Sequence, residues 1–312
     1  MARHESILGL IGDTPLVGVH QLSPNPDVRI YAKLEGQNPG GSSKDRIALK
    51  MVELAERDGV LAPGAHILEP SSGNTGIGLA LVARLRGYHL RVVMPENVSI
   101  ERRQLLEIFG AEVTLSPGEE GSNGAIRMAE KIVADEPGYT YLFQYGNPAN
   151  PLAHYEHTGP EIWRDCPEID VFVAGLGTSG TLMGAGKYLK ERNPSVKVVA
   201  VEPPAGELVQ GLRNLDDGFV PPIFDPEVLD RKLIVRPRES VLHTRRLLEE
   251  CGVFAGISSG AAVAGAVKTA ATMESGTIVT LLPDGGWKYL SSGAWTDDLD
   301  TVVERATRIN YW

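Results

Sequence analysis

The sequence predicts an α/β fold in which each parallel β-sheet lies between two layers of helices. Short runs of β-branched and apolar residues alternate along the chain with amphipathic segments of helical periodicity. Loops rich in Gly, Ser and Thr follow several of the predicted strands. This alternation is typical of parallel strands joined by crossover helices. Because domains average roughly 150 residues, the 312-residue chain is expected to form two such three-layer domains.

Apolar runs and helical periodicity place the expected elements in order. Buried strands are predicted at residues 66–69, 91–94, 112–115, 170–174, 196–201 and 277–282. Amphipathic helices are predicted at residues 45–58, 75–86, 100–109, 122–134, 182–191 and 240–251. In the first helix Ile47, Met51 and Leu54 share one face, and Gly59 follows where a left-handed cap is favoured. The Ala- and Gly-rich run at 256–273 predicts a buried helix and not a membrane span.

The composition indicates a soluble, cytoplasmic globular protein. Hydrophobic residues make up 42% of the chain and charged residues 22%. A net charge of −10 argues against nucleic acid or an anionic membrane as the main partner, but it allows a local basic pocket. Two cysteines, Cys166 and Cys251, are too few for a disulfide framework or a metal site, so free thiols and no metal are expected. The first residues lack the apolar core of a signal peptide.

The glycine-rich loop after the strand at 170–174 is expected to bind an anion. Its glycines let the backbone approach a phosphate, and its hydroxyl groups add further donors. The residues expected to hold the anion are Gly177, Thr178, Ser179, Gly180 and Thr181. The spacing does not complete the dinucleotide fingerprint, but Glu202 follows at about the distance of its acidic residue, so nucleotide binding stays open.

Lys44 stands where the first predicted helix begins, in the segment Asn-Pro-Gly-Gly-Ser-Ser-Lys-Asp-Arg. A cation is disfavoured there by the helix dipole, so a surface lysine would contribute little to stability. A desolvated lysine with a lowered pKa, in contrast, suits Schiff-base chemistry. The alternative is an exposed lysine paired with an acid.

A second candidate anion site is the segment Pro-Ser-Ser-Gly-Asn-Thr at 70–75, which lies between a strand and a helix. Its hydroxyl and N–H groups fit a carboxylate, and Asn74 offers an amide donor. A simple capped helix start is equally compatible with this pattern.

These motifs, taken in order, resemble the fold-type II pyridoxal-phosphate enzymes, which have a tryptophan synthase β-like fold. The matching motifs are Asn-Pro-x-x-Ser-x-Lys-Asp-Arg, Ser-Ser-Gly-Asn-Thr-Gly, Gly-x-Gly-Thr-x-Gly-Thr and Gly-Ile-Ser-Ser-Gly at 256–260. Segments at 12–16, 144–150 and 154–161 are similar to those of the cysteine synthases. The resemblance covers residues 12–289. It implies a smaller mobile domain at residues 39–146, and a larger phosphate-binding domain formed by 1–38 and 147–312.

The resemblance also implies roles for the matched positions. Lys44 would form the Schiff base with pyridoxal 5′-phosphate and act as general base, and Asn74 would contact the phenolic oxygen of the cofactor. The loop at 177–181 would hold the phosphate. Ser258 would face the pyridine nitrogen, where a hydroxyl favours β-elimination over transamination, although it could be only a helix cap. Residues that would bind the substrate carboxylate are Ser71, Ser72, Thr75 and Gln144.

Arg213 is the residue expected to select the leaving group. Enzymes specific for O-acetylserine tend to have a short Gly-Ile-Gly run at this place, whereas a guanidinium suits a phosphate dianion. The surrounding sequence is similar to the actinobacterial O-phosphoserine sulfhydrylases. Two alternatives remain: a salt bridge with Asp216 or Asp217, and the arginine of B-type enzymes that use O-acetylserine with thiosulfate.

We therefore expect a cysteine synthase that converts O-phospho-L-serine to L-cysteine through an aminoacrylate. By the same resemblance, sulfur would come from a thiocarboxylated ubiquitin-like carrier protein, the enzyme would be a homodimer, and residues 309–312 would be an active-site flap. Those terminal residues could instead dock onto the body of the protein. The other functions considered are an O-acetylserine enzyme using sulfide or thiosulfate, a cystathionine β-synthase, a serine or threonine deaminase, a non-catalytic binding protein and a nucleotide-binding oxidoreductase.

Overall fold

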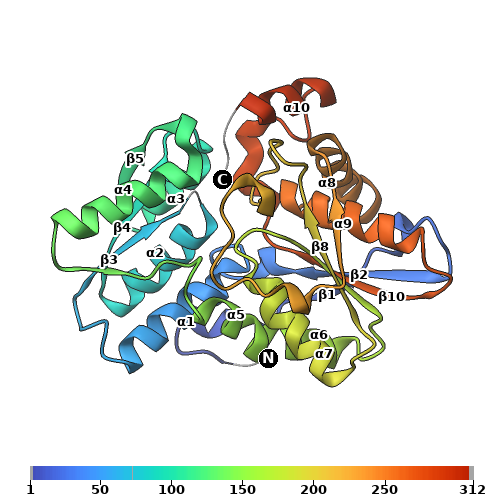
Figure 1. The fold of residues 1–312 in the computed structure, drawn as a ribbon, viewed down its shortest axis with the longest axis horizontal. Coiled ribbons are helices and arrows are strands. Elements are labelled where there is room, and N and C mark those ends of the chain that lie inside the picture. The colour runs from blue at the N-terminus through green and yellow to red at the C-terminus, as the bar shows by residue number, and fades with distance from the viewer. Residues whose placement is uncertain (1–2, 72, 309–312) are drawn as a thin grey trace.

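The computed structural model describes residues 3–71 and 73–308, which form two lobes, each built around a β-sheet (Figure 1). Helices cover both faces of each sheet, so the predicted α/β class with three-layer packing is confirmed. Among the described residues, no helix is both long and apolar enough to cross a membrane.

The larger sheet has six strands in the order β1-β2-β10-β7-β8-β9. Its strands are β1 (Leu16–Gly18), β2 (Val28–Leu34), β7 (Val171–Gly175), β8 (Lys197–Glu202), β9 (Arg231–Ile234) and β10 (Gly276–Leu282). All neighbouring pairs are parallel except β1 and β2, which are antiparallel. This edge pair was not expected from the sequence.

Alternate side chains of the central strands bury both faces of this sheet. Val171 and Val173 of β7 pack in one core with α8 (Pro237–Cys251) and α9 (Ile257–Ala270). Phe172 and Ala174 point to the other face, into the core formed with α6 (Gly159–Asp165) and α7 (Lys187–Arg192). A strand buried on both sides needs apolar residues at every position, which explains the continuous runs in the sequence.

The smaller sheet has four parallel strands in the order β5-β4-β3-β6. Its strands are β3 (His66–Pro70), β4 (His89–Pro95), β5 (Glu112–Ser116) and β6 (Tyr139–Tyr141). Its two faces pack against α1 (Lys44–Arg57), α2 (Asn74–Arg86) and α3 (Ile100–Ile108) on one side, and α4 (Gly121–Asp135) on the other.

Shorter elements connect the lobes and close the larger one. The remaining α-helices are α5 (Ala149–Ala153), α6 (Gly159–Asp165), α7 (Lys187–Arg192) and α10 (Leu299–Arg308). Single-turn π-helices η5 (His154–Thr158) and η6 (Leu182–Gly186) precede α6 and α7. The 3₁₀ segments are Ile7–Leu10, His20–Leu22, Glu35–Gln37, Gly118–Glu120, Leu215–Asp217, Pro226–Val228 and η9 (Gly286–Ser292).

The six predicted strands are all present, and the buried run at 256–273 forms α9. The helix predicted at 182–191 is wrong in detail, because its first five residues form the π-helix η6 and only the remainder is α-helical. Gly59 has a φ of 71°, as the predicted cap requires. All four strands of the smaller sheet lie between residues 66 and 141, but the boundaries and the mobility of a domain at 39–146 stay predictions.

A buried cluster of four charged residues joins α1 to the larger sheet. The Arg46 guanidinium binds Glu35, which follows β2, through Nε at 2.7 Å and Nη2 at 2.8 Å. It also binds Glu161 of α6 at 2.6 and 2.7 Å, and Lys33 of β2 lies 2.7 Å from the same carboxylate. Two cations and two anions are thus brought out of water together, and each has a partner.

We expect Glu161→Gln to lower the free energy of unfolding by about 3 kcal/mol or more, because it removes one of the two carboxylates of the cluster and leaves Glu35 to balance the buried charges of both Lys33 and Arg46. Urea denaturation of the holoenzyme measures this loss. Glu168→Gln is the matched control, since Glu168 is half-exposed in a surface pair with Arg29, and it should cost less than about 1 kcal/mol. Equal losses in both variants would contradict the prediction.

The same variant has a defined pH dependence. Burial alone would raise the pKa of Glu161, but the hydrogen bonds and charge of Arg46 and the charge of Lys33 lower it to about 2. A carboxyl with a lowered pKa stabilises the folded state above its unfolded pKa of about 4.3, and this contribution is lost as the pH falls towards 2. The stability difference between wild type and Glu161→Gln should therefore shrink over that interval.

Candidate active site

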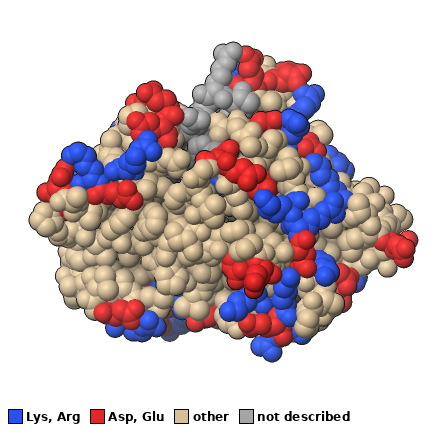
Figure 2. Space-filling view, in the orientation of Figure 1, with Lys and Arg blue, Asp and Glu red and all other residues tan. Residues whose placement is uncertain are grey.

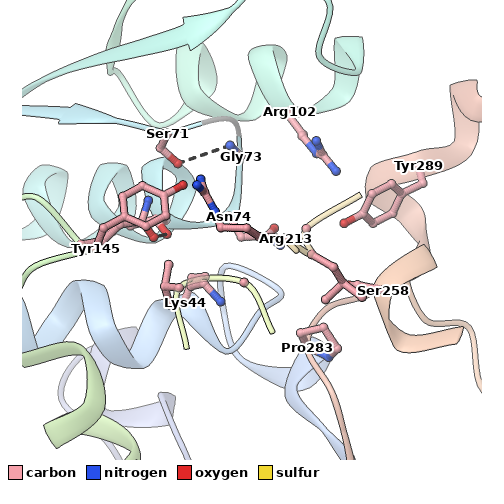
Figure 3. Close-up of a pocket in the computed structure, with 16 residues that line it drawn as sticks. Lys44, Ser71, Gly73, Asn74, Arg102, Tyr145, Arg213, Ser258, Pro283 and Tyr289 are labelled. Carbon is pink, nitrogen blue, oxygen red and sulfur yellow. Dashed lines mark hydrogen bonds between the residues drawn. The ribbon is translucent and has the colours of Figure 1, made fainter. Parts of the chain in front are cut away.

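A cavity between the lobes lies at the carboxyl ends of strands from both sheets (Figure 3). Ser71 follows β3, Gly177 follows β7 and Pro283 follows β10. The lining residues are Lys44, Ser71, Gly73, Asn74, Thr75, Arg102, Gln144, Tyr145, Gly177, Thr178, Gly211, Leu212, Arg213, Ser258, Pro283 and Tyr289. This is the edge at which open α/β sheets bind their ligands.

Most of the predicted site residues meet at this cavity. Ser179 and Thr181 line an adjoining hollow, and Lys44 contributes to both spaces. Gly180 lies in the same loop, whereas Ser72 is outside the described residues. No group of His, Cys, Asp and Glu among the described residues could hold a metal ion.

Lys44 is the first residue of α1 and is partly buried at the cavity wall. Burial lowers the pKa of its ammonium group, while the carboxylates of Asp284 and Glu35 oppose this shift. Within the described part of the chain, its Nζ makes neither a hydrogen bond nor an ion pair, so it is not the acid-paired surface lysine considered as the alternative. An amine with a lowered pKa is more often uncharged at neutral pH and can act as a nucleophile or base.

The loop at 177–181 combines close backbone approach with one buried hydroxyl group that has no partner within the described residues, that of Ser179. Ser179 has a φ of 71°, and its buried Oγ has no hydrogen-bond partner in the described structure. At Gly177 a Cβ atom would lie 2.7 Å from the Gly211 carbonyl oxygen, so only glycine fits there. Such a strained loop with a spare donor at a helix start is suited to an anion such as phosphate.

Two residues outside the loop hold its hydroxyls in place. The Asn150 side chain donates to Thr178 Oγ1 at 3.0 Å and to the Gln144 carbonyl at 3.0 Å, joining the loop to the segment after β6. His154 lies between Thr181 Oγ1 at 3.2 Å and Thr158 Oγ1 at 2.9 Å. Burial, together with the charges of Lys44 and Arg46, lowers the pKa of His154 to about 3, so its imidazole is neutral.

The predicted carboxylate-binding residues lie together beyond β3. Ser71 Oγ accepts the N–H groups of Gly73 at 3.3 Å and Gly76 at 2.9 Å, so it also caps the start of α2. Thr75 Oγ1 donates to Gln144 Oε1 at 2.6 Å. The helix-cap and ligand interpretations of this segment are therefore compatible, because Ser71 and Thr75 both line the cavity as well.

Gln144 is held by Glu69, whose part the sequence did not reveal. The buried Glu69 carboxylate accepts the backbone N–H groups of Phe143 at 2.8 Å and Gln144 at 3.0 Å. Burial raises the pKa of Glu69 to about 8, although these two donors oppose the shift. A charged residue inside the apolar run of β3 was the only local signal for this contact.

Asn74 and Ser258 lie at the start of helices on opposite sides of the cavity. The Asn74 amide binds Asp284 Oδ2 through Nδ2 at 2.7 Å and Lys288 Nζ through Oδ1 at 2.7 Å. Ser258 is 4% exposed in the first turn of α9, and its Oγ faces Gly211. Neither Asp284 nor Lys288 was among the predicted site residues.

Arg213 is buried in the cavity wall with 6% of its surface exposed. Its guanidinium carbon lies 4.5 Å from the ring centre of Phe219 and 5.2 Å from that of Tyr145. Asp217, one of the two acids considered as its ion-pair partner, accepts the N–H of Gly206 through Oδ1 at 3.1 Å. The ion-pair alternative with Asp216 or Asp217 stays open beside the phosphate role. Stacking on aromatic rings uses the faces of a guanidinium, and its N–H groups lie in the plane of the group.

Arg102 is a second cavity-lining arginine, and it was not among the predicted site residues. It reaches the cavity from α3, on the side opposite Lys44 in Figure 3, and its guanidinium lies 4.7 Å from the Tyr289 ring centre. Its Nη2 donates to Gln210 Oε1 at 3.2 Å. The cavity therefore has cationic groups on three sides, from Lys44, Arg102 and Arg213.

Comparison with known proteins assigns the family. A family model described as "Pyridoxal-phosphate dependent enzyme" matches residues 7–284. The chain belongs to this family. It is 44% identical over 304 residues to the cysteine synthase of Staphylococcus aureus, covering 94% of this chain and 98% of that protein. It is therefore a pyridoxal-phosphate-dependent enzyme of the cysteine synthase family, as the motifs predicted.

Solved structures of this family have the same fold. O-ureido-L-serine synthase is 40% identical with a TM-score of 0.89, over 94% of this chain and 96% of that one. The cysteine synthase of Entamoeba histolytica is 34% identical with a TM-score of 0.89, over 98% and 96% of the two chains. A hydrogen sulfide-producing enzyme of Fusobacterium nucleatum is 38% identical with a TM-score of 0.87, over 92% and 100%.

The cavity of this family member fits pyridoxal phosphate. The spare Oγ of Ser179 and the loop residues that line the adjoining hollow suit the phosphate, and Lys44 lines both this hollow and the main cavity. An amine with a lowered pKa suits attachment to the aldehyde. The family assignment thus favours this cofactor over a nucleotide as the ligand of the loop.

We expect Gly180→Ala to weaken pyridoxal-phosphate binding at least about tenfold, since displacing the loop loses one or more hydrogen bonds to a charged group. The added Cβ would lie 1.9 Å from Asn150 Oδ1, so either the loop or Asn150 must move. Fluorescence titration of the cofactor-free protein gives the dissociation constant. Gly18→Ala is the control, because its Cβ meets only the exposed, rotatable His20 ring. Unchanged affinity in Gly180→Ala would contradict the phosphate role.

Proposed function

We propose that this enzyme makes L-cysteine by β-replacement of O-phospho-L-serine. The observation that carries the substrate choice is the buried guanidinium of Arg213 in the cavity wall. A guanidinium offers two parallel charge-assisted hydrogen bonds to a phosphate dianion, and burial strengthens them. An acetyl group has no charge to match, so this wall favours a phosphorylated leaving group.

Lys44 is the proposed catalytic residue. Its Nζ is the group placed to hold the cofactor and to move the Cα proton of the substrate, because its lowered pKa leaves part of the amine uncharged. Bound pyridoxal phosphate supplies the electron sink for the pair left at Cα when that proton is removed. Ser258 is proposed to meet the pyridine nitrogen with a hydroxyl, which leaves this nitrogen uncharged and limits the sink to β-elimination and replacement.

Ser71, Ser72, Thr75 and Gln144 are proposed to bind the substrate carboxylate. Hydroxyl groups and N–H groups at the start of α2 provide several donors within one turn, and the positive end of the helix dipole attracts the anion. With the carboxylate held here and the phosphate at Arg213, the Cα–H bond of the substrate would be oriented towards Lys44. The two anion contacts would thus use binding energy to hold the Cα–H bond close to Lys44.

O-acetylserine with sulfide or thiosulfate is the strongest alternative substrate pair. The Entamoeba histolytica relatives are described as cysteine synthase and O-acetyl serine sulfhydrylase, and they have the same fold. In that case Arg213 would contact thiosulfate or a structural anion and not the leaving group. Cystathionine β-synthesis is a further alternative, which the motifs leave open.

The sulfur donor is proposed to be a thiocarboxylated ubiquitin-like carrier protein.

The enzyme is proposed to be a homodimer. On the face shown in Figure 2, Lys and Arg lie mostly beside Asp and Glu, and a broad area over the lobe of the smaller sheet carries few charges. A surface depleted of charge supports subunit contact. The flap predicted at residues 309–312 lies outside the described residues.

Lys44→Ala should lower turnover by about 10²–10⁴-fold, the range for loss of a positioned acid–base group. Borohydride reduction of the wild type, followed by peptide mass spectrometry, should find the cofactor mass on the peptide that contains Lys44. Lys50→Ala is the control, since Lys50 lies on the same helix in an ion pair with Glu156. Attachment of the cofactor to another lysine would refute the assignment.

Arg213→Ala should lower kcat/KM for O-phosphoserine by about 30-fold or more, while the loss for O-acetylserine should stay below about threefold. The reason is that only the phosphate meets the guanidinium as an anion. Steady-state kinetics with both substrates measures the ratio. Arg103→Ala controls for net charge, because Arg103 is exposed on α3 and paired with Glu107. Equal losses with the two substrates would overturn the phosphate role.

A further inference from the structure

Lys288 is a fully buried lysine in the wall behind Asn74. Its relative exposure is 0%, and it lies in η9 between Trp287 and Tyr289. Its Nζ donates to Asn74 Oδ1 at 2.7 Å and to the Gly41 carbonyl at 3.1 Å. Neither acceptor carries a charge. Burying an ammonium group in this way is costly, so a specific role must retain it.

The contacts of Lys288 determine how the Asn74 amide is oriented. The ammonium group can only donate, so it must face the amide oxygen, and an ionised carboxylate can only accept, so Asp284 must face the amide nitrogen. The Asp284 carboxylate is itself held by the Tyr289 hydroxyl at 2.5 Å. Of the two N–H bonds of Asn74, one is used by Asp284. The other remains for a ligand in the cavity that Asn74 lines.

Charged groups from several elements surround Lys288. Burial lowers its pKa to about 8, the carboxylates of Asp284 and Asp45 oppose this shift, and the cations Arg102 and Lys44 reinforce it. The ammonium form therefore exists below about pH 8, and the amine form above it. Only the ammonium form forces the amide oxygen to face Lys288, because a neutral amine can also accept a hydrogen bond.

We propose that Lys288 is a positioning residue that locks the Asn74 amide so that its second N–H donates to the phenolic oxygen of the bound cofactor. The inference rests on the proposed contact between Asn74 and that oxygen. The positive charge behind the amide oxygen also polarises the N–H bond, which strengthens donation to an anionic oxygen. Because Lys288 also binds the Gly41 carbonyl, it ties Asn74 to the segment that leads into Lys44.

Lys288→Met and Lys288→Gln test this role through the cofactor and not through turnover. Loss of one charge-assisted hydrogen bond in Lys288→Met should raise the dissociation constant for pyridoxal phosphate about tenfold. Lys288→Gln keeps a neutral donor for Asn74 and should regain most of this affinity. The absorbance spectrum of the bound cofactor is then recorded from about pH 6 to pH 10, which brackets the pKa of Lys288. Wild type should show a step near pH 8, and both variants should lack it.

Lys268→Met is the matched control, since Lys268 also donates to a backbone carbonyl, that of Ile234, but lies far from the cavity. It should match the wild type in affinity and spectrum. Persistence of the step near pH 8 in Lys288→Gln, or unchanged affinity in Lys288→Met, would overturn the proposal. Urea denaturation of each holoenzyme shows whether a variant is folded. If Lys288→Met does not fold, Lys288→Gln still tests the proposal through the loss of the step near pH 8.

Asn74→Ala separates this inference from the proposed function. In the Asn74→Ala background, Lys288→Met should weaken cofactor binding no further, because the two residues act through one contact. A further tenfold loss would show that Lys288 acts independently of Asn74. If Asn74→Ala alone leaves the cofactor affinity and spectrum unchanged, the role proposed for Asn74 is overturned. If Asn74→Ala changes the affinity and spectrum but Lys288→Met does not, only the role of Lys288 is overturned.

Discussion

The buried guanidinium of Arg46 is the contact on which the arrangement of the site depends. It lies two residues after Lys44 on α1, and its two carboxylate partners come from the end of β2 and from α6. A side chain held by four hydrogen bonds to carboxylates in a dry interior has one position, so the first turn of α1 has one position as well. Lys44 is thereby placed by the larger sheet, although its helix packs on the smaller one.

Hydrogen bonds between loops then join the parts of the cavity into one unit. Asn150 connects the anion loop at Thr178 with the backbone of Gln144, and Glu69 fixes that same backbone from β3. On the other side, Asp284 and Lys288 hold Asn74. The residues that line the cavity are therefore held in place by residues that do not line it. This is how a site between two lobes keeps its geometry.

Most of the predicted strands could be recognised in the sequence because both of their faces are buried. The strands that were missed are only partly buried. Strands β3, β4, β7, β8 and β10 have largely apolar runs. The unpredicted strands β1, β6 and β9 are edge strands with few buried residues, and a half-buried strand needs no such run. The predicted β5 is also an edge strand and has one buried residue, so burial on both faces does not explain its prediction. In β2 the apolar pattern is broken by Lys33, whose charge is paired with Glu161 in the folded chain.

The sequence by itself determined which residues are proposed to act in catalysis and anion binding. Lys44 at a helix start and the glycine-rich loop after β7 are local patterns, and a strand–loop–helix segment places their groups at the carboxyl edge of a sheet wherever it occurs. Only the tertiary structure decided which distant residues support them. Lys288 lies 214 positions from Asn74, and Asn150 lies 28 positions from Thr178. Such pairs depend on the order of the strands and on how the two lobes meet, and side-chain periodicity along one element contains no information about either.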